Sequence, residues 1–131
     1  MRNYQRKKNN PYLLPQSLYM RTIYLIRDYD RLKQQEKELS DISISVCFDD
    51  MPKAKYKFGS GVENSAIRLA KIGAEIKAVE DALDTIPEFF RKPIMDNIKY
   101  GSRYPLGADE RTFRRYKQRF IYEVADFIGY I

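Results

Sequence analysis

The apolar pattern is most regular in residues 64–86, NSAIRLAKIGAEIKAVEDALDTI. The large apolar side chains recur here at steps of three and four residues, at Leu69, Ile72, Ile76, Val79, Leu83 and Ile86. Residues at this spacing share one face of an α-helix, and such a stripe is buried against another helix. The pattern therefore predicts a long amphipathic helix, which we expect to begin at a cap formed by Asn64 or Ser65.

A partner for this helix lies earlier in the chain, in residues 15–40. Four leucines follow one another at intervals of seven residues there, at Leu18, Leu25, Leu32 and Leu39. Pro15 suits the first turn of a helix, where its missing N–H is not needed. Two such helices joined by a connector pack as an antiparallel hairpin, so we predict a helical hairpin over residues 15–86.

An insertion at residues 41–63 interrupts this hairpin. Apolar and polar residues alternate in residues 42–48 and again in residues 53–58, on either side of Pro52. Alternation with a period of two is typical of strands, yet an isolated two-stranded hairpin is only marginally stable. A small β-hairpin and a mobile loop therefore both remain open for residues 42–58.

A third part, residues 87–131, has the signals of two further helices. Pro87 and Glu88 mark a helix start, and Gly101 marks a helix end. Asp109 then predicts the cap of a last amphipathic helix. Pro93 either lies within the first of these helices, at the loss of one hydrogen bond, or shifts its start to about residue 92. The fold class we expect is mainly α, a helical hairpin plus a C-terminal helix-turn-helix-like pair, forming one compact domain.

The amino-acid composition excludes several classes of enzyme and of binding site. The 131 residues include no histidine and a single cysteine, Cys47. This excludes Ser-His-Asp and Cys-His catalysis, internal disulfides and cysteine-based zinc sites. The Gly-rich motifs that cradle nucleotide phosphates do not occur in the sequence. We therefore expect neither an enzyme nor a cofactor or metal site and, because no apolar run approaches the ~20 residues of a membrane span, a cytoplasmic protein.

The net charge of +6 is concentrated at the two ends of the chain. No carboxylate precedes Asp28, and residues 1–14 are expected to form a flexible basic arm. The start of the last helix holds five bases and no acid between Arg111 and Arg119. Arginine and glutamine can pair with base edges in the major groove, and lysine can neutralise phosphates. The predicted DNA-binding residues are Arg111, Thr112, Arg114, Arg115, Lys117, Gln118, Arg119, Arg103, Arg2, Arg6, Lys7 and Lys8.

The order of these signals resembles a known family. Ile86-Pro87-Glu88, a helix ending at Gly101, and then Asp109, Arg111, Thr112, Arg114, Arg115 and Lys117 look like the sigma-region-4-like motif of phage late-gene transcription regulators of the RinA and ArpU type. The whole chain is also similar to small prophage proteins of Gram-positive bacteria. Between Gly101 and Asp109, however, only seven residues stand where a scaffold helix of about eight is usual. Either Pro93 divides the preceding helix, or the motif is shortened.

The resemblance implies a phage or prophage transcription regulator that acts in a bacterial host. It would bind double-stranded DNA with the helix that starts near Asp109, as a homodimer or higher oligomer, with host RNA polymerase as a further partner. Two alternatives stay open. One is a small helical adaptor or inhibitor that binds a host or phage protein, and the other is a DNA-packaging component.

Overall fold

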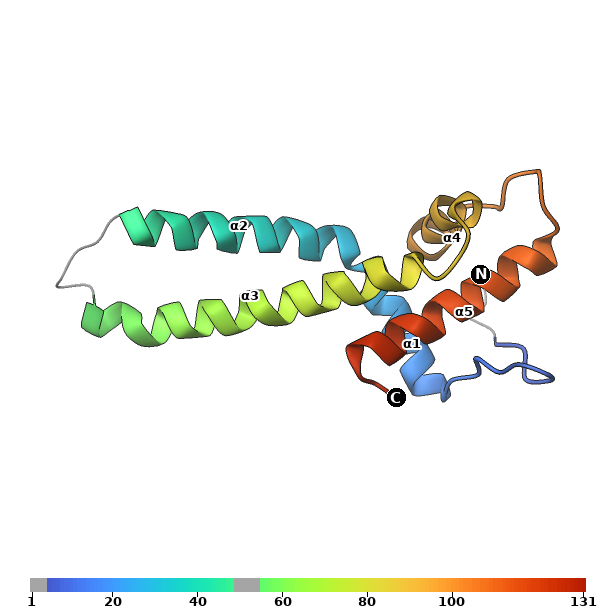
Figure 1. Cartoon of the computed structure of the whole chain (residues 1–131), viewed down its shortest axis with the longest axis horizontal. Coiled ribbons are helices and arrows are strands. Elements are labelled where there is room, and N and C mark those ends of the chain that lie inside the picture. The colour runs from blue at the N-terminus through green and yellow to red at the C-terminus, as the bar shows by residue number, and fades with distance from the viewer. Residues whose placement is uncertain (1–4, 49–54) are drawn as a thin grey trace. The chain divides into compact units, whose positions relative to one another are not determined.

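The computed structural model describes residues 5–48 and 55–131; the side chains of residues 42–48 and 55–63 are not described. Within these ranges the chain is mainly helical and has no strand. The helices are α1 (Gln16–Arg27), α2 (Tyr29–Phe48), α3 (Lys55–Leu83), α4 (Glu88–Tyr100) and α5 (Glu110–Ile128) (Figure 1). The chain forms two compact units, residues 1–28 with 77–131 and residues 29–76, which are described in turn.

The unit of residues 29–76 consists of α2 and most of α3, which run side by side (Figure 1). A Cβ atom at Gly73 of α3 would lie 3.5 Å from a carboxylate oxygen of Glu36 on α2, which is ordinary van der Waals contact. Leu32, Ile72 and Ile76 are buried. The stripe predicted from residues 64–86 therefore lies on the buried side of α3 in this unit.

The alternating residues 42–58 are not strands wherever the structure describes them. Residues 42–48 continue α2, and residues 55–58 begin α3, so Asn64 and Ser65 lie inside α3 and do not cap it. Residues 49–54 of the predicted β-hairpin lie outside the described residues. These residues form helix and not strand because each residue that extends an existing helix adds a hydrogen bond. A lone hairpin has no such support.

The helix predicted over residues 15–40 is divided at Asp28. The N–H of Asp28 still bonds to the carbonyl oxygens of Tyr24 and Leu25, at 3.0 and 3.1 Å, and α2 begins at the next residue. The leucine spacing did not reveal this break, since Leu25 and Leu32 are buried on both sides of it. Asp28 is the last residue of the first segment of the other unit.

The core of that other unit is a packed group of three helices. α1 packs on both α4 and α5, which also pack on each other. Their fully buried side chains include Ile26 of α1, Ile94 of α4 and Phe120 of α5. Val79 and Ala82, near the end of α3, are fully buried as well. Buried apolar side chains of α4 and α5, the two helices predicted within residues 87–131, thus contribute to this core.

α4 is one continuous helix with Pro93 inside it. Pro87 precedes its first residue, and Gly101 ends it with a φ of 69°, a left-handed conformation that glycine adopts without strain. Pro93 therefore does not divide α4 into two shorter helices. The connector to α5 runs from Gly101 to Asp109, longer than the three or four residues of an ordinary helix-turn-helix turn.

Within the described part of the chain, we find no helix with both the length and the apolar character needed to cross a membrane.

Candidate nucleic-acid interface

The start of α5 is fixed by a cap and by aromatic packing. The carboxylate of Asp109 accepts a hydrogen bond from the Arg111 N–H at 3.4 Å, so the predicted cap is confirmed. Behind it, the buried Phe113 ring stacks on Tyr104 of the connector, with 4.7 Å between ring centroids, and meets Phe90 of α4 edge-on at 4.9 Å. These rings hold the first two turns of α5 against α4, so that the opposite side of the helix faces solvent.

Residues 5–14 form a closed loop, called here the N-terminal loop. Its two ends are joined by the buried amide of Gln5, which pairs with the backbone of Leu14 through two hydrogen bonds of 2.9 Å. Asn10 closes the tip, because its side chain donates to the Arg6 carbonyl and accepts from the Tyr12 N–H. The segment expected as a flexible arm therefore has defined contacts from Gln5 onward.

Gln118 of α5 attaches this loop to the helix. Its amide nitrogen donates to the side-chain oxygen of Gln5 at 3.0 Å and to the Tyr12 carbonyl at 2.7 Å. Tyr12 also packs edge-on against Tyr122, one helical turn further along α5, at 5.3 Å between centroids. Both amide hydrogens of Gln118 are thus used inside the protein. The structure gives this side chain a positioning role in place of the base contact expected from the sequence.

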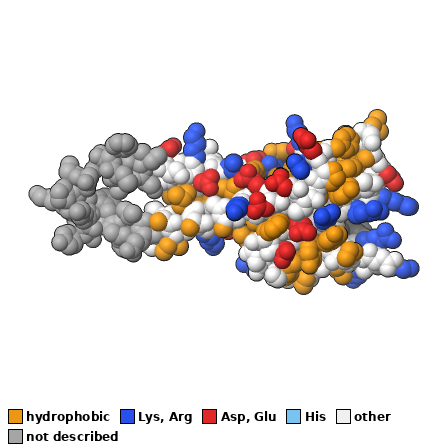
Figure 2. Space-filling model, in the orientation of Figure 1, with side chains coloured by type: hydrophobic (Ala, Val, Ile, Leu, Met, Phe, Trp, Pro, Cys, Tyr) orange, Lys and Arg blue, Asp and Glu red, His pale blue; other side chains and the backbone are white. Residues whose placement is uncertain are grey.

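The loop and the start of α5 together carry a surface of exposed cations, which we call the basic face. It consists of Arg6, Lys7, Lys8, Arg111, Arg114 and Arg115, all of which are exposed. Figure 2 shows Lys and Arg side chains gathered at the right-hand end of the view, where the N-terminal loop and the start of α5 lie. Two basic zones from opposite ends of the sequence are therefore neighbours in the fold.

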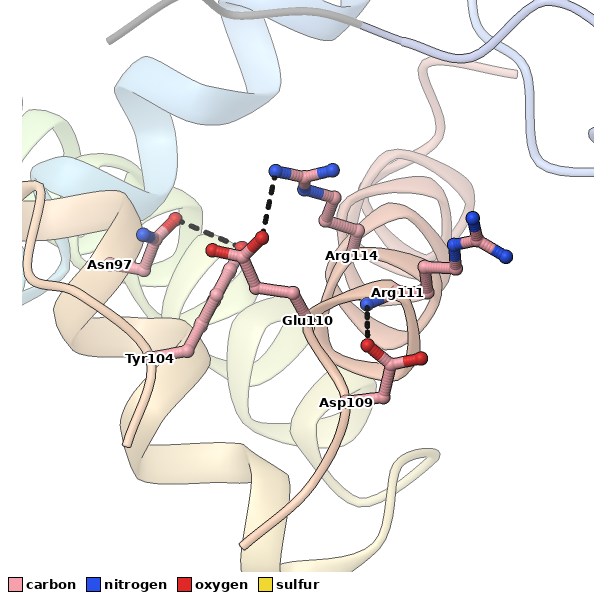
Figure 3. A network of polar contacts seen from close by, with 6 residues as sticks. All are labelled: Asn97, Tyr104, Asp109, Glu110, Arg111 and Arg114. Carbon is pink, nitrogen blue, oxygen red and sulfur yellow. Dashed lines mark hydrogen bonds and ion pairs between the residues drawn. The ribbon is translucent and has the colours of Figure 1, made fainter. Parts of the chain in front are cut away.

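The acids at the start of α5 do not cancel this charge. Glu110 forms one exposed ion pair, 3.2 Å from Arg114 in the next turn (Figure 3). Exposed pairs of this spacing contribute only a few tenths of a kcal/mol. The side chains of Arg111 and Arg114 extend in different directions around the helix (Figure 3). The basic face can therefore offer guanidinium groups to more than one point on a ligand.

The other predicted residues are placed less favourably for base contact. Arg103 is exposed on the connector, whereas Thr112, Lys117 and Arg119 are half-buried. The Nε atom of Arg119 is buried and has no hydrogen-bond partner among the described residues. Arg2 lies outside the described residues. The exposed part of the predicted site is therefore the basic face and Arg103.

Lys117 belongs to a polar network at the end of α4. Its ammonium donates to the Oδ1 atom of the buried Asn97 at 2.8 Å, and the amide nitrogen of Asn97 donates to the Ser102 carbonyl at 2.8 Å. Tyr104 donates to the same Oδ1 atom at 3.4 Å (Figure 3). Burial lowers the pKa of Lys117, and the positive charges of Arg27 and Arg114 lower it further. The network joins α4, the connector and α5 through one asparagine.

Three residues with a defined role here were not predicted from the sequence. Gln5 closes the N-terminal loop, Asn97 accepts from Lys117, and Arg27 of α1 donates from Nε to the Ile98 carbonyl at 3.0 Å. The contacts of Asn97 and Arg27 join different helices, and Gln5 and Leu14 are nine residues apart in a loop, so no helical or strand periodicity predicts these contacts. The sequence drew attention to Arg27 in one way, because it is one of the basic residues that precede the first acidic residue, Asp28.

The described residues contain no group of three or more acidic or cysteine side chains that could hold a metal ion. In comparisons with protein-family models, curated proteins and solved structures, no match to the chain was found.

Proposed function

We propose that the protein binds double-stranded DNA through the basic face. The observation that carries this proposal is the attachment of the N-terminal loop to α5 by Gln118. It brings Arg6, Lys7 and Lys8 to the same side of α5 as Arg111 and Arg115. Counterions released from phosphates make such a surface bind DNA with an affinity that falls steeply with salt.

The geometry of α5 suits a helix that enters the major groove by its first two turns. These turns are exposed and basic, while the later turns are held by Phe120, Val124 and the N-terminal loop. Arg111 and Arg115 lie one turn apart and can reach base edges, where arginine pairs with guanine. The N-terminal loop beside them supplies contacts to the DNA backbone.

The proposed role of this binding is control of transcription from phage or prophage promoters in the cytoplasm of a bacterial host. This role follows from the resemblance of residues 86–119 to the late-gene regulators. With it we propose the arrangement expected from the sequence, a helical hairpin with a helix-turn-helix-like pair. A homodimer would present two copies of α5 to two half-sites. Host RNA polymerase is the protein partner that we propose for this role.

Anisotropy of fluorescently labelled duplexes tests the proposal. The duplexes are random sequences and fragments from the protein's own genomic neighbourhood, each titrated at several salt concentrations. A preference of about a thousandfold or more for one fragment supports a regulator. Binding without preference but with a steep salt dependence supports the DNA-packaging alternative. No binding at low salt refutes DNA binding.

A matched pair of double variants assigns the binding to the basic face. Replacing Arg111 and Arg115 by glutamine is expected to lower the slope of log affinity against log salt by about two. Replacing Lys77 and Lys92, which are exposed elsewhere in the same unit, removes the same charge. Equal losses in the two double variants would contradict the assignment.

One observation favours the protein-binding alternative. Leu106 on the connector is 98% exposed, and Phe89, whose ring would lie 3.2 Å from a Cβ atom built at the adjacent Gly107, is 53% exposed. Exposed apolar side chains that lie close together are typical of protein interfaces. Reversing the charge at Arg114 and Arg115 separates the two functions. It abolishes DNA binding under the main proposal and leaves a complex with a protein partner largely intact under the alternative.

A further inference from the structure

A second group of cations meets at the end of α4, apart from the N-terminal loop. Arg27 comes from α1, and Arg114 and Lys117 come from α5. Arg27 donates to the Ile98 carbonyl at 3.0 Å, and Lys117 donates to the side chain of the preceding residue, Asn97, at 2.8 Å. The two side chains are therefore anchored at neighbouring residues in the last turn of α4.

The charge of this group is poorly compensated in the free protein. The hydrogen-bond partners of Arg27 and Lys117 within the described chain are neutral oxygens, a backbone carbonyl and an amide. Arg114 has an exposed pair with Glu110. The ammonium of Lys117 is half-buried, and the positive charges of Arg27 and Arg114 near it raise the free energy of the protein without a ligand. A bound anion would remove that cost.

We infer that Arg27, Arg114 and Lys117 form one binding position for a phosphodiester of the DNA backbone. This inference rests on the proposed DNA binding and gives Lys117 a backbone contact. The guanidinium of Arg27 is fixed at Nε and lies over the Tyr24 ring, 5.6 Å from its centroid. Its two terminal nitrogens can pair with the two free oxygens of a phosphate, a geometry that arginine provides. Lys117 adds a positive charge from the side of α5.

The position of the group relative to α5 agrees with this role. Lys117 lies on the side of α5 that faces α4, since it donates to Asn97 there, and Arg114 lies on the exposed surface one turn before it. Arg111 and Gln118 lie around the helix from that side. When a helix occupies the major groove, the elements beside it meet the phosphates that flank the groove. Arg27, at the end of α1, is such a flanking contact.

The test uses the full chain, a labelled duplex and three variants. Arg27→Gln and Lys117→Met each remove one charge of the group, and Lys92→Gln removes an exposed charge elsewhere on α4. Each of the first two is expected to lower the slope of log affinity against log salt by about one, with a loss of affinity of about five- to tenfold near 0.1 M salt. Lys92→Gln should match the wild type.

The double variant decides whether the residues share one phosphate. If they do, Arg27→Gln combined with Lys117→Met also lowers the slope by about one, because only one contact is lost. A decrease of about two would show two separate phosphates and overturn the shared position. Single variants that bind like the wild type would overturn it as well, while leaving the proposed function in place. A wild type that does not bind DNA would overturn both.

A stability measurement separates loss of the contact from loss of the fold. Lys117→Met removes a half-buried charge that lies near two others, so its thermal midpoint is expected to be no lower than that of the wild type. Weaker DNA binding in a variant that melts earlier would count against the inference. Weaker binding in a variant of equal or greater stability supports it.

Discussion

Substitution of Gln118 by alanine tests whether this side chain positions the N-terminal loop or reads a base. In the structure its amide donates to Gln5 at 3.0 Å and to the Tyr12 carbonyl at 2.7 Å. The alanine variant loses both hydrogen bonds and leaves the paired amide of Gln5 and the backbone of Leu14 intact. The loop should therefore detach from α5 more often without unfolding the three-helix core.

The size of the effect follows from the two hydrogen bonds. Each neutral hydrogen bond contributes about 1 kcal/mol net, so the attachment of the loop is weakened by about 2 kcal/mol. Because about 1.4 kcal/mol corresponds to a tenfold change in an equilibrium constant, local opening becomes about 25-fold more frequent. When the loop leaves α5, the pair formed by Gln5 and Leu14 is no longer buried against the helix, and the Leu14 N–H, which donates to Gln5 at 2.9 Å, becomes open to exchange.

Amide hydrogen exchange at Leu14 measures this opening directly, and DNA anisotropy measures its consequence. We expect exchange about 25-fold faster and a weaker affinity for all duplexes alike, because Arg6, Lys7 and Lys8 lose their fixed position. Gln34→Ala is the control, since it removes a single exposed contact, to Glu38 of α2. Unchanged exchange at Leu14 together with an altered preference among DNA sequences would refute the positioning role and favour base contact by Gln118.

Three further perturbations test the fold that carries the basic face. Gly107→Ala places a Cβ atom 3.2 Å from the Phe89 ring at a φ of +122°, so its free energy of unfolding should fall by about 1–3 kcal/mol. It should fall less in Gly129→Ala, where φ is +90° but no atom lies within 4 Å; equal losses in chemical denaturation would exclude the contact with Phe89. Burial, and then the nearby Tyr104, raise the pKa of Tyr19 from 10.0 to about 12. The folded state therefore holds the proton more tightly, and this stabilisation is complete below pH 10 and is lost as the pH rises to about 12. Denaturation of the wild type and Tyr19→Phe over this range should show the larger decrease in the wild type; parallel curves would contradict the shifted pKa. Asp109→Ala removes the cap of α5 and should reduce the free energy of unfolding by about 1 kcal/mol, and an unchanged denaturation midpoint would show that the cap contributes nothing.

The helical elements could be predicted where their signals are local. The stripe through Ile72 and Ile76, the cap at Asp109 and the glycine at the end of α4 each depend on residues within one or two turns. The division at Asp28 has no such signal. The alternation in residues 42–48 was misleading, because Ile44 and Phe48 are also four residues apart and so fit a helix equally well.

The arrangement of the candidate site depends on contacts that no local pattern encodes. Gln5 and Gln118 are separated by 113 residues, and glutamine has no strong preference that marks it for such a role. Sequence analysis identified the basic residues by their charge but could not tell which would be exposed. It assigned Gln118 and Lys117 to DNA and did not reveal that the first holds the N-terminal loop and that the second bonds to Asn97.

The unit that carries the basic face is built from both ends of the chain, and this has a consequence for its synthesis. α1 leaves the ribosome before residues 29–76, whereas its partners α4 and α5 follow them. The apolar side of α1 must therefore be kept from aggregating until α4 and α5 emerge. Residues 29–76 are complete well before that moment. The basic face therefore assembles only after residues 29–76 have been made, and a ribosome that stops before α5 releases a product without it.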